Sequence, residues 1–210
     1  MMMIHECEQG SQEWLVRRMG LPTASEFSTV MASGRGGGES KTRATYMRKL
    51  AGEIITGELA ESYTSPHMDR GKVMEDEARD MYALEYNADP VRVGFVTNFN
   101  AGCSPDSLLG SNGGLEIKTA LPHIQIERLE KDDLPPEHRA QVQGSMWICE
   151  REYWDFVSYW PRLPLLRVRV ARDEEYIATI KSAVDRFNDE LHELVEKIRR
   201  YGALPNQEAA

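Results

Sequence analysis

The sequence predicts one domain of the α/β class, and three observations support this. A chain of 210 residues can bury about 70% of the surface that its unfolded form exposes, and it shows no internal repeat. Stretches with apolar residues at three- and four-residue steps, typical of helices, alternate with short stretches rich in aromatic and β-branched residues, typical of strands. Residues 102–118 have the pattern of a β-hairpin.

The helices are predicted from their caps and their apolar faces. Ser11 is a suitable N-cap for the first helix, and Thr23 with Glu26 forms a capping box for the second. Gly57 ends the third helix, and Asp173 is a suitable N-cap for the last. The six predicted helices cover residues 12–19, 23–31, 41–56, 67–86, 138–150 and 173–200.

Runs of aromatic and β-branched residues predict the strands, and turn residues predict the connections. Residues 110–114 are turn residues that can adopt positive φ, and residues 33–40 are so rich in glycine that we expect a mobile loop. Residues 121–136 are expected to form a linker, and residues 204–210 a frayed tail. The predicted strands cover residues 91–97, 102–106, 115–118, 153–160 and 165–170.

Charge and composition exclude several classes of protein. A net charge of −9 argues against a protein that coats nucleic acid by bulk attraction, so any contact with DNA requires a local basic lining or enclosure. No apolar run has the length of a membrane span, and no signal peptide is visible, so we expect a cytoplasmic protein. Cys7, Cys103 and Cys149 form no CxxC pair, which argues against a disulfide framework or a structural zinc site.

The predicted hairpin brings two carboxylates and one ammonium group to one surface. Asp106 lies on one arm, while Glu116 and Lys118 project from a single face of the other, because side chains alternate along a strand. Carboxylates brought together require a positive charge between them, and oxygen ligands select a hard cation such as Mg²⁺. Pro105-Asp106, nine residues and Glu116-Ile117-Lys118 form the PD-(D/E)xK signature of nucleases. A solvated hairpin with an incidental ion pair is the alternative.

A second group of residues suits an anion. The helix start after Thr23 offers unpaired N–H groups, to which Ser25 adds a hydroxyl and Arg18 a guanidinium fork. The alternative is that Thr23 only caps the helix and that Arg18 pairs with an acid. Three cations around the glycine-rich loop suit a phosphate-contacting arm, although a disordered solvent loop is the commoner explanation. They are Arg35, Lys41 and Arg43.

Six blocks occur in one order along the chain. They are EQG at residues 8–10 with Trp14, RMG at 18–20 with TASE at 23–26, GK at 71–72 with Glu75 and AR at 78–79, CSPD at 103–106, LEIK at 115–118, and AQVQ at 140–143 with SMW at 145–147. In these blocks the chain resembles the phage lambda exonuclease family, also called the YqaJ-type viral recombinases. Departures from the family pattern are the glycine-rich loop, the linker over residues 121–136, and Gly144 in place of a bulky residue.

The resemblance implies a restriction-endonuclease-like fold with a central mixed β-sheet flanked by helices. It implies a processive Mg²⁺-dependent exonuclease that degrades the 5′-ended strand of double-stranded DNA, releases mononucleotides and leaves a 3′ overhang. It also implies a homotrimeric ring, a single-strand annealing protein as partner in recombination, and a phage or prophage origin within a bacterial cell. The alternatives are an endonuclease of the same fold and a non-catalytic DNA-end clamp.

The resemblance also implies residue roles. The residues implied for catalysis and for two metal ions, Mg²⁺ with Mn²⁺ as a substitute, are Asp106, Glu116, the Ile117 carbonyl, Glu75 through water, Lys118 and Gln143. Lys118 would position or help deprotonate the attacking water, and Gln143 would orient DNA or water. The residues implied for DNA contact are Arg18, Ser25 and Ser104, which would bind the terminal 5′-phosphate, and Trp14.

Overall fold

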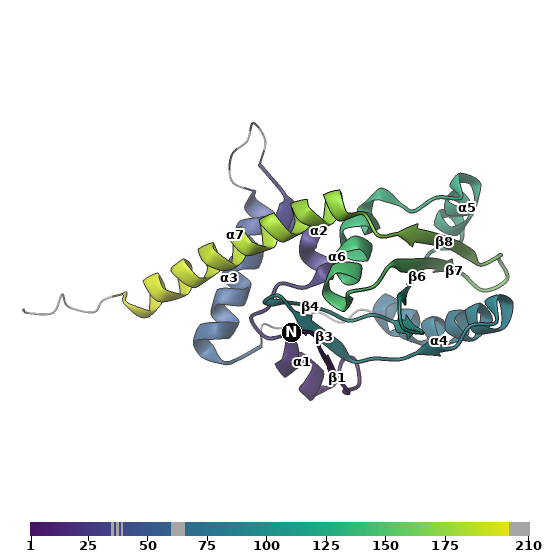
Figure 1. Ribbon diagram of the computed structural model, residues 1–210, viewed down its shortest axis with the longest axis horizontal. Coiled ribbons are helices and arrows are strands. Elements are labelled where there is room, and N and C mark those ends of the chain that lie inside the picture. Colours follow the sequence, from purple (N-terminus) through teal and green to yellow (C-terminus); the bar gives the residue numbers. More distant parts are fainter. Residues whose placement is uncertain (35, 37, 39, 60–65, 202–210) are drawn as a thin grey trace, which may run out of the picture.

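The fold was obtained as a computed structural model, which describes residues 1–34, 36, 38, 40–59 and 66–201, the last range without side chains before residue 74. The α/β class and the central mixed sheet flanked by helices are confirmed (Figure 1). Arg35 and residues 204–210 lie outside the described residues, as does part of the predicted loop over residues 33–40.

The helices and strands follow one another along the whole described chain. The α-helices are α1 (Gln12–Arg18), α2 (Phe27–Met31), α3 (Lys41–Thr56), α4 (Pro66–Tyr86), α5 (Pro122–Lys131), α6 (Arg139–Cys149) and α7 (Glu174–Arg199), with short 3₁₀ helices η1 (Ala24–Glu26) and η3 (Pro136–His138). The strands are β1 (Met3–His5), β2 (Pro90–Val91), β3 (Phe95–Asn98), β4 (Ala101–Cys103), β5 (Ser107–Leu109), β6 (Gly113–Thr119), β7 (Tyr153–Tyr159) and β8 (Leu166–Ala171). Among the described residues, no helix is long and apolar enough to cross a bilayer.

One cap and one linker differ from the sequence prediction. The predicted caps at Ser11 and Asp173 are confirmed, since their side chains accept the N–H groups of Trp14 and Tyr176. The predicted capping box at Thr23 is wrong, because the Thr23 side chain makes no capping hydrogen bond and η1 precedes α2. The predicted linker contains α5, which starts with a proline in its first turn, a position where the missing N–H costs nothing.

The strands form two sheets. The larger has the order β2-β5-β6-β7-β8, in which β6 and β7 are parallel and the other neighbours are antiparallel. The smaller has the order β1-β3-β4 and is antiparallel. The predicted hairpin is therefore shorter than expected, because Gly102 and Cys103 belong to β4 and pair with β3. Its arms are β5 and β6 alone.

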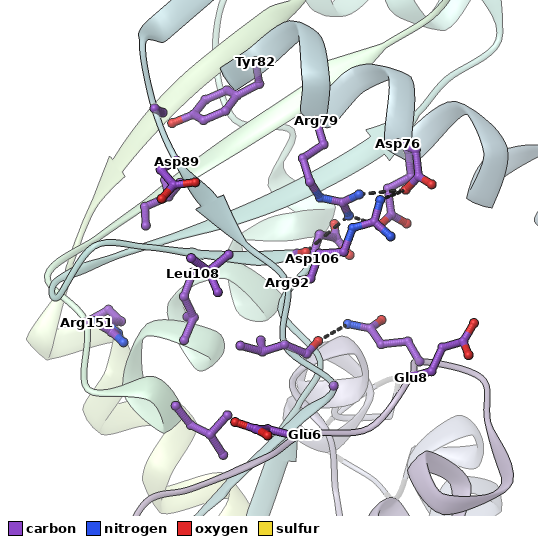
Figure 2. A pocket seen from close by; sticks show the side chains of 18 of the residues that line it. Glu6, Glu8, Asp76, Arg79, Tyr82, Asp89, Arg92, Asp106, Leu108 and Arg151 are labelled. Carbon is purple, nitrogen blue, oxygen red and sulfur yellow. Dashed lines mark hydrogen bonds and ion pairs between the residues drawn. The ribbon is translucent and has the colours of Figure 1, made fainter. Parts of the chain in front are cut away.

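A cavity of about 1600 Å³ lies between the N-terminal segment, the chain around β2 and the larger sheet (Figure 2). Gln9 holds the N-terminal segment in place, because its Nε2 donates to the Val93 carbonyl at 3.0 Å and to the Pro105 carbonyl at 2.8 Å. Pro105 directly precedes Asp106. The first residues of the chain therefore support the segment that leads into the hairpin.

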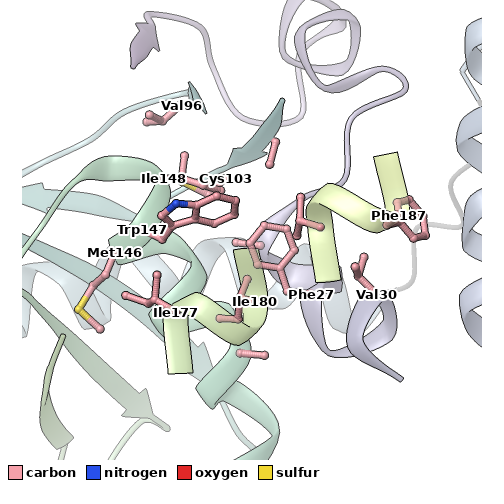
Figure 3. Packing of buried hydrophobic residues seen from close by; sticks show 14 of the residues in the cluster. Phe27, Val30, Val96, Cys103, Met146, Trp147, Ile148, Ile177, Ile180 and Phe187 are labelled. Carbon is pink, nitrogen blue, oxygen red and sulfur yellow. The ribbon is translucent and has the colours of Figure 1, made fainter. Parts of the chain in front are cut away.

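Two clusters of buried apolar residues cover opposite faces of the larger sheet. Alternation along β7 shows the division: Trp154 and Phe156 belong to the cluster under α6 and α7, while Val157 and Tyr159 belong to the cluster against α4. The first cluster is the larger, and its members come from α2, α3, α6 and α7 as well as from the strands (Figure 3). Burial of this apolar surface is the main stabilising contribution to the fold.

Gly144 allows α6 to approach α2. A Cβ atom at this position would overlap the ring of Phe27, which is completely buried. The departure from the family pattern at this position thus has a packing reason, since the phenyl ring occupies the space that a larger side chain would need.

We predict that Gly144→Ala destabilises the protein by about 1–3 kcal/mol, because the overlap with Phe27 outweighs the gain in helix propensity. Gly52 is the matched control: it also lies inside a helix, α3, but a Cβ there would meet no atom within 4 Å. Gly52→Ala should therefore stabilise by about 0.5–1 kcal/mol. Thermal unfolding of the two variants measures both effects, and equal shifts would contradict the packing argument.

Candidate active site

Asp106 takes the place of a missing strand partner. The ladder between β5 and β6 ends where Ser107 lies opposite Leu115, and beyond Leu115 the described strands pair with β6 only on the β7 side. The backbone N–H of Ile117 donates to Oδ2 of Asp106 at 2.5 Å. Because Asp106 is bonded there, its carboxylate lies beside residues 116–118, as the hairpin pattern predicted.

Glu116 and Lys118 project from the face of β6 opposite to α4. The Glu116 side chain is 2% exposed, and its Oε1 accepts hydrogen bonds from Lys118 Nζ at 2.5 Å and from Gln141 Nε2 at 2.6 Å. Its Oε2 is buried and has no hydrogen-bond partner among the described residues. A buried carboxylate oxygen without a donor is unfavourable, so this atom has the chemistry of a ligand for a hard cation.

Arg79 joins α4 to the start of the hairpin. Its Nη2 contacts Glu75 Oε1 at 2.5 Å and the Asp106 carbonyl at 3.3 Å, and its Nε donates to Ser107 Oγ at 3.0 Å. Its side chain is only 7% exposed. Glu75 is therefore held near the other two carboxylates by an arginine to which the sequence analysis gave no role.

The site carries more negative charge than its own cations balance. The pKa of Asp106 is raised well above its usual range, first by burial and then by the charges of Glu116 and Glu75, against the opposing effect of Lys118. Burial lowers the pKa of Lys118, but the three carboxylates outweigh it and the net shift is upward. Lys118 is therefore a charged ammonium group at neutral pH.

Each of these carboxylates accepts hydrogen bonds from its own donors. No three His, Cys, Asp or Glu side chains in the described ranges already converge as a complete metal site. Asp106 accepts an N–H group, and Glu116 accepts an ammonium and an amide. The excess of carboxylates and the unpartnered oxygen of Glu116 nevertheless give this group the donor chemistry that hard divalent cations prefer.

Trp14, Arg18 and Ser104 lie together next to this group. Trp14 Nε1 donates to Ser104 Oγ at 2.8 Å, and the guanidinium carbon of Arg18 lies 4.3 Å from the centre of the Trp14 ring. Thr23 and Gly102 form a parallel bridge, so the segments that carry Ser25 and Ser104 run side by side. Ser25 is exposed, and its hydroxyl lies 3.2 Å from that of Thr23. The predicted phosphate-binding residues are thus close in space although far apart in sequence.

Gln141, rather than Gln143, contacts the carboxylates. Both ends of the Gln143 amide bind backbone: Nε2 donates to the Ala171 carbonyl at 2.9 Å, and Oε1 accepts the Asp173 N–H at 3.0 Å. Residues two apart on a helix point about 200° away from each other, so only one of the two glutamines can face β6. The structure therefore does not bring Gln143 to the site.

Of the predicted loop cations, the structure describes Arg43 and Lys41, and neither contacts the carboxylates of the site. Arg43 lies between α3 and α7, where its Nη1 contacts Glu190 at 2.6 Å, its Nε donates to the Val30 carbonyl, and its guanidinium group stacks on Phe187. Lys41 is exposed at the start of α3. Arg43 therefore has a packing role that its position beside the loop did not reveal.

The cavity reaches this group from the α4 side. Trp14, Arg18, Glu75 and Asp106 line it, and Arg79 extends toward Asp76 at its edge (Figure 2). Glu116 and Lys118 do not line it, because they project from the other face of β6. Asp106 thus lines the cavity and also lies beside Glu116 and Lys118.

Comparisons with known proteins show the family of this chain. Residues 13–152 match the YqaJ-like viral recombinase domain. An alkaline exonuclease from Laribacter hongkongensis, LHK-Exo, is 32% identical in two crystal structures, one of them a complex with dAMP, with TM-scores of 0.82 and 0.84 and coverage of 92% of this chain and 98% of that chain.

Two further relatives are more distant. A phage related exonuclease from Haemophilus somnus 129PT shares the fold with a TM-score of 0.64 at 16% identity, over 85% of this chain and 96% of that chain. The uncharacterized protein ExoD of Escherichia coli (strain K12) is 34% identical over 64 residues, which are 29% of this chain and 74% of that protein.

We predict that Asp106→Asn stabilises the metal-free protein. The pKa of the Asp106 carboxyl is raised in the folded state, so stability falls as the pH rises from the unfolded pKa toward the folded one, and the loss is present at neutral pH. Asparagine removes the charge and keeps an oxygen for the Ile117 N–H.

The measurement is thermal unfolding at neutral pH in a chelator, where each kcal/mol raises the midpoint by about 2–4 °C. Asp89→Asn is the control, because Asp89 is also an acid that lines the cavity but is exposed. The midpoint of unfolding of this variant should therefore change little. A lower midpoint for Asp106→Asn would contradict the excess of negative charge.

Proposed function

Since the chain belongs to the YqaJ-like viral recombinase family, we propose that it degrades the 5′-ended strand of double-stranded DNA, releases mononucleotides and leaves 3′ single-stranded overhangs for recombination by strand annealing. The observation that carries this proposal is the buried Glu116 carboxylate, with one oxygen unpartnered, beside Asp106 and Lys118. The likeness to an alkaline exonuclease over nearly the whole chain supports an exonuclease of DNA rather than another nuclease.

A divalent cation, Mg²⁺ by the chemistry of its oxygen donors, belongs to this proposal. Asp106 and Glu116 would hold it, the Ile117 carbonyl would complete the ligand set, and Glu75 would bind through water. When bound, two such ions activate a water molecule and neutralise charge on the phosphate that is cut. The raised pKa of Asp106 fits this role, because burial and the nearby carboxylates both disfavour its ionised form, and a bound cation would offset both effects.

Lys118 and Gln141 would act on the water and the phosphate. Because the carboxylates raise the pKa of Lys118, its ammonium group donates hydrogen bonds, orients the attacking water and stabilises negative charge that develops on the phosphate. Gln141 fixes the orientation of Glu116 through its amide, at 2.6 Å. We therefore assign to Gln141 the positioning of Glu116, whereas the sequence analysis expected Gln143 to orient DNA or water.

The cluster of Arg18, Ser25 and Ser104 would bind the terminal 5′-phosphate, with Trp14 holding Arg18 and Ser104 in place. A site for a terminal phosphate next to the cation site makes cutting start at ends and proceed from the 5′ side. The family relationship extends the proposal to a homotrimeric ring, to processive action and to a single-strand annealing protein as partner. Enclosure by a ring would suit a chain with a net charge of −9.

The first test is digestion of linear and closed circular duplex DNA in Mg²⁺. We expect nucleotide release from the linear form only, and its loss by a factor of at least about 10² in Asp106→Ala and in Lys118→Ala, with the fold kept as judged by circular dichroism. Cutting of the circular form would indicate an endonuclease. Undiminished digestion by either variant would remove that residue from the mechanism.

The two glutamines provide a matched pair. Gln141→Ala should lower kcat by about 10–10² and change stability little, because its contact orients the reacting group. Gln143→Ala should instead cost about 1–3 kcal/mol of stability and leave the activity of the folded enzyme unchanged, since this buried side chain loses two hydrogen bonds to backbone. The reverse assignment of effects would show that Gln143 is the functional residue.

Arg18→Ala should slow digestion of 5′-phosphorylated ends by about tenfold or more and affect 5′-hydroxyl ends much less. The physical reason is that the guanidinium group pairs with a charge that only the phosphorylated end carries. Rates on the two substrates, compared with the same ratio for the native chain, measure the effect. Equal losses on both ends would exclude a role in recognising the phosphate.

A further inference from the structure

The far end of the cavity is lined by two arginines of β8, each stacked on a tyrosine. The guanidinium carbon of Arg167 lies 4.6 Å from the centre of the Tyr86 ring, and that of Arg169 lies 4.0 Å from the centre of the Tyr153 ring. All four residues line the same cavity as Asp106. The cavity therefore extends from the candidate active site to a surface of guanidinium groups and aromatic rings.

Asp155 of β7 fixes both guanidinium groups. Its carboxylate is fully buried and accepts Nε of Arg167 at 3.1 Å, and Nε and Nη2 of Arg169 at 2.8 and 2.9 Å. Among the described residues, the two Nη groups of Arg167 and Nη1 of Arg169 have no hydrogen-bond partner. One carboxylate against two cations leaves one positive charge, and the free Nη groups are donors with fixed positions.

The spacing of these donors suits a nucleic-acid strand. Arg167 and Arg169 are two residues apart, so they project from one face of β8 at a separation of about 6–7 Å, which is similar to the spacing of successive phosphates in a strand. The cavity, about 1600 Å³, exceeds the roughly 300–1,000 Å³ of a small-ligand pocket. It is too small to enclose several base pairs of duplex. These dimensions fit a few unpaired nucleotides.

We propose that Arg167 and Arg169 bind phosphates of the uncut, complementary DNA strand after it has lost its partner. The inference rests on the proposed function: a terminal phosphate held at Arg18 ends the cut strand within the site, so the strand that continues into the cavity is the complement. Asp89 lies at the same end of the cavity as Tyr82 (Figure 2). Its charge offsets part of the attraction, so donor geometry rather than net charge sets the binding.

The test is binding of fluorescently labelled duplexes, blunt or with a 3′ overhang of about ten nucleotides, measured by anisotropy in a chelator so that no cutting occurs. The native chain should bind the overhang duplex more tightly. In the double variant Arg167→Lys, Arg169→Lys the affinity for the overhang duplex should fall about tenfold, and that for the blunt duplex should not change. Lysine keeps a charge opposite Asp155 and removes the planar fork.

The control is Arg199→Lys, Arg200→Lys at the exposed end of α7, which should bind both duplexes like the native chain. If the double variant of β8 does not fold, Arg169→Lys alone serves, because Arg167 still pairs with Asp155. Unchanged affinity for the overhang duplex, or an equal loss on the blunt one, would overturn the proposal. Loss of the overhang preference on adding dAMP alone would also overturn it, in favour of a mononucleotide site.

This binding assay separates the inference from the proposed function. Cleavage polarity is measured independently, with label at the 5′ or the 3′ end in Mg²⁺. If the native chain cuts with the wrong polarity, while the β8 variant loses the preference for the overhang duplex, only the proposed function is disproved. If the native chain cuts from 5′ ends, while the native chain and the β8 variant bind the overhang duplex with equal affinity, only the inference is disproved.

Discussion

The active-site geometry depends on the unequal lengths of two paired strands. The pairing between the two strands stops at Ser107, the first residue of β5, which lies opposite Leu115. β6 continues beyond this point to Thr119. The Ile117 N–H beyond the end of the ladder needs an acceptor, and a carboxylate supplies it at 2.5 Å. The same carboxylate is thereby fixed in a buried place beside Glu116, and burial together with the charges of Glu116 and Glu75 raises the pKa of Asp106. One hydrogen bond thus connects the sheet edge, the charge excess and the proposed cation site.

The residues predicted from the hairpin came together because their contacts are local. Alternation along β6 and the pairing of β5 with β6 across a short turn suffice to place Asp106 near Glu116, whatever the rest of the fold does. The choice between Gln141 and Gln143 needed the rotation of α6 about its axis, which Gly144 and Phe27 determine through packing. A comparison of both glutamines with the apolar positions of the helix would have been the available signal.

Other differences from the sequence prediction have the same physical origin. The proline at the start of α5 and the helix-favouring residues that follow it were visible, but the charges and the neighbouring prolines favoured a linker. Thr23 and Glu26 match the capping-box pattern, yet the backbone of Thr23 forms a parallel β-bridge with Gly102 instead. Arg43 and Arg79 look alike in sequence, as cations near predicted functional segments. Only their partners, Glu190 and Glu75, separate a packing role from one at the site.

The support that Gln9 gives to Pro105 spans 96 positions of the chain, and β1 pairs with β3 across a similar distance. During synthesis the first residues must therefore wait for about half of the protein to emerge from the ribosome before their partners exist. Contacts so distant in sequence carry a large entropy of loop closure and slow the folding of a domain. The N-terminal segment would then dock late, and a growing chain would acquire its reactive groups only in the final stages of assembly.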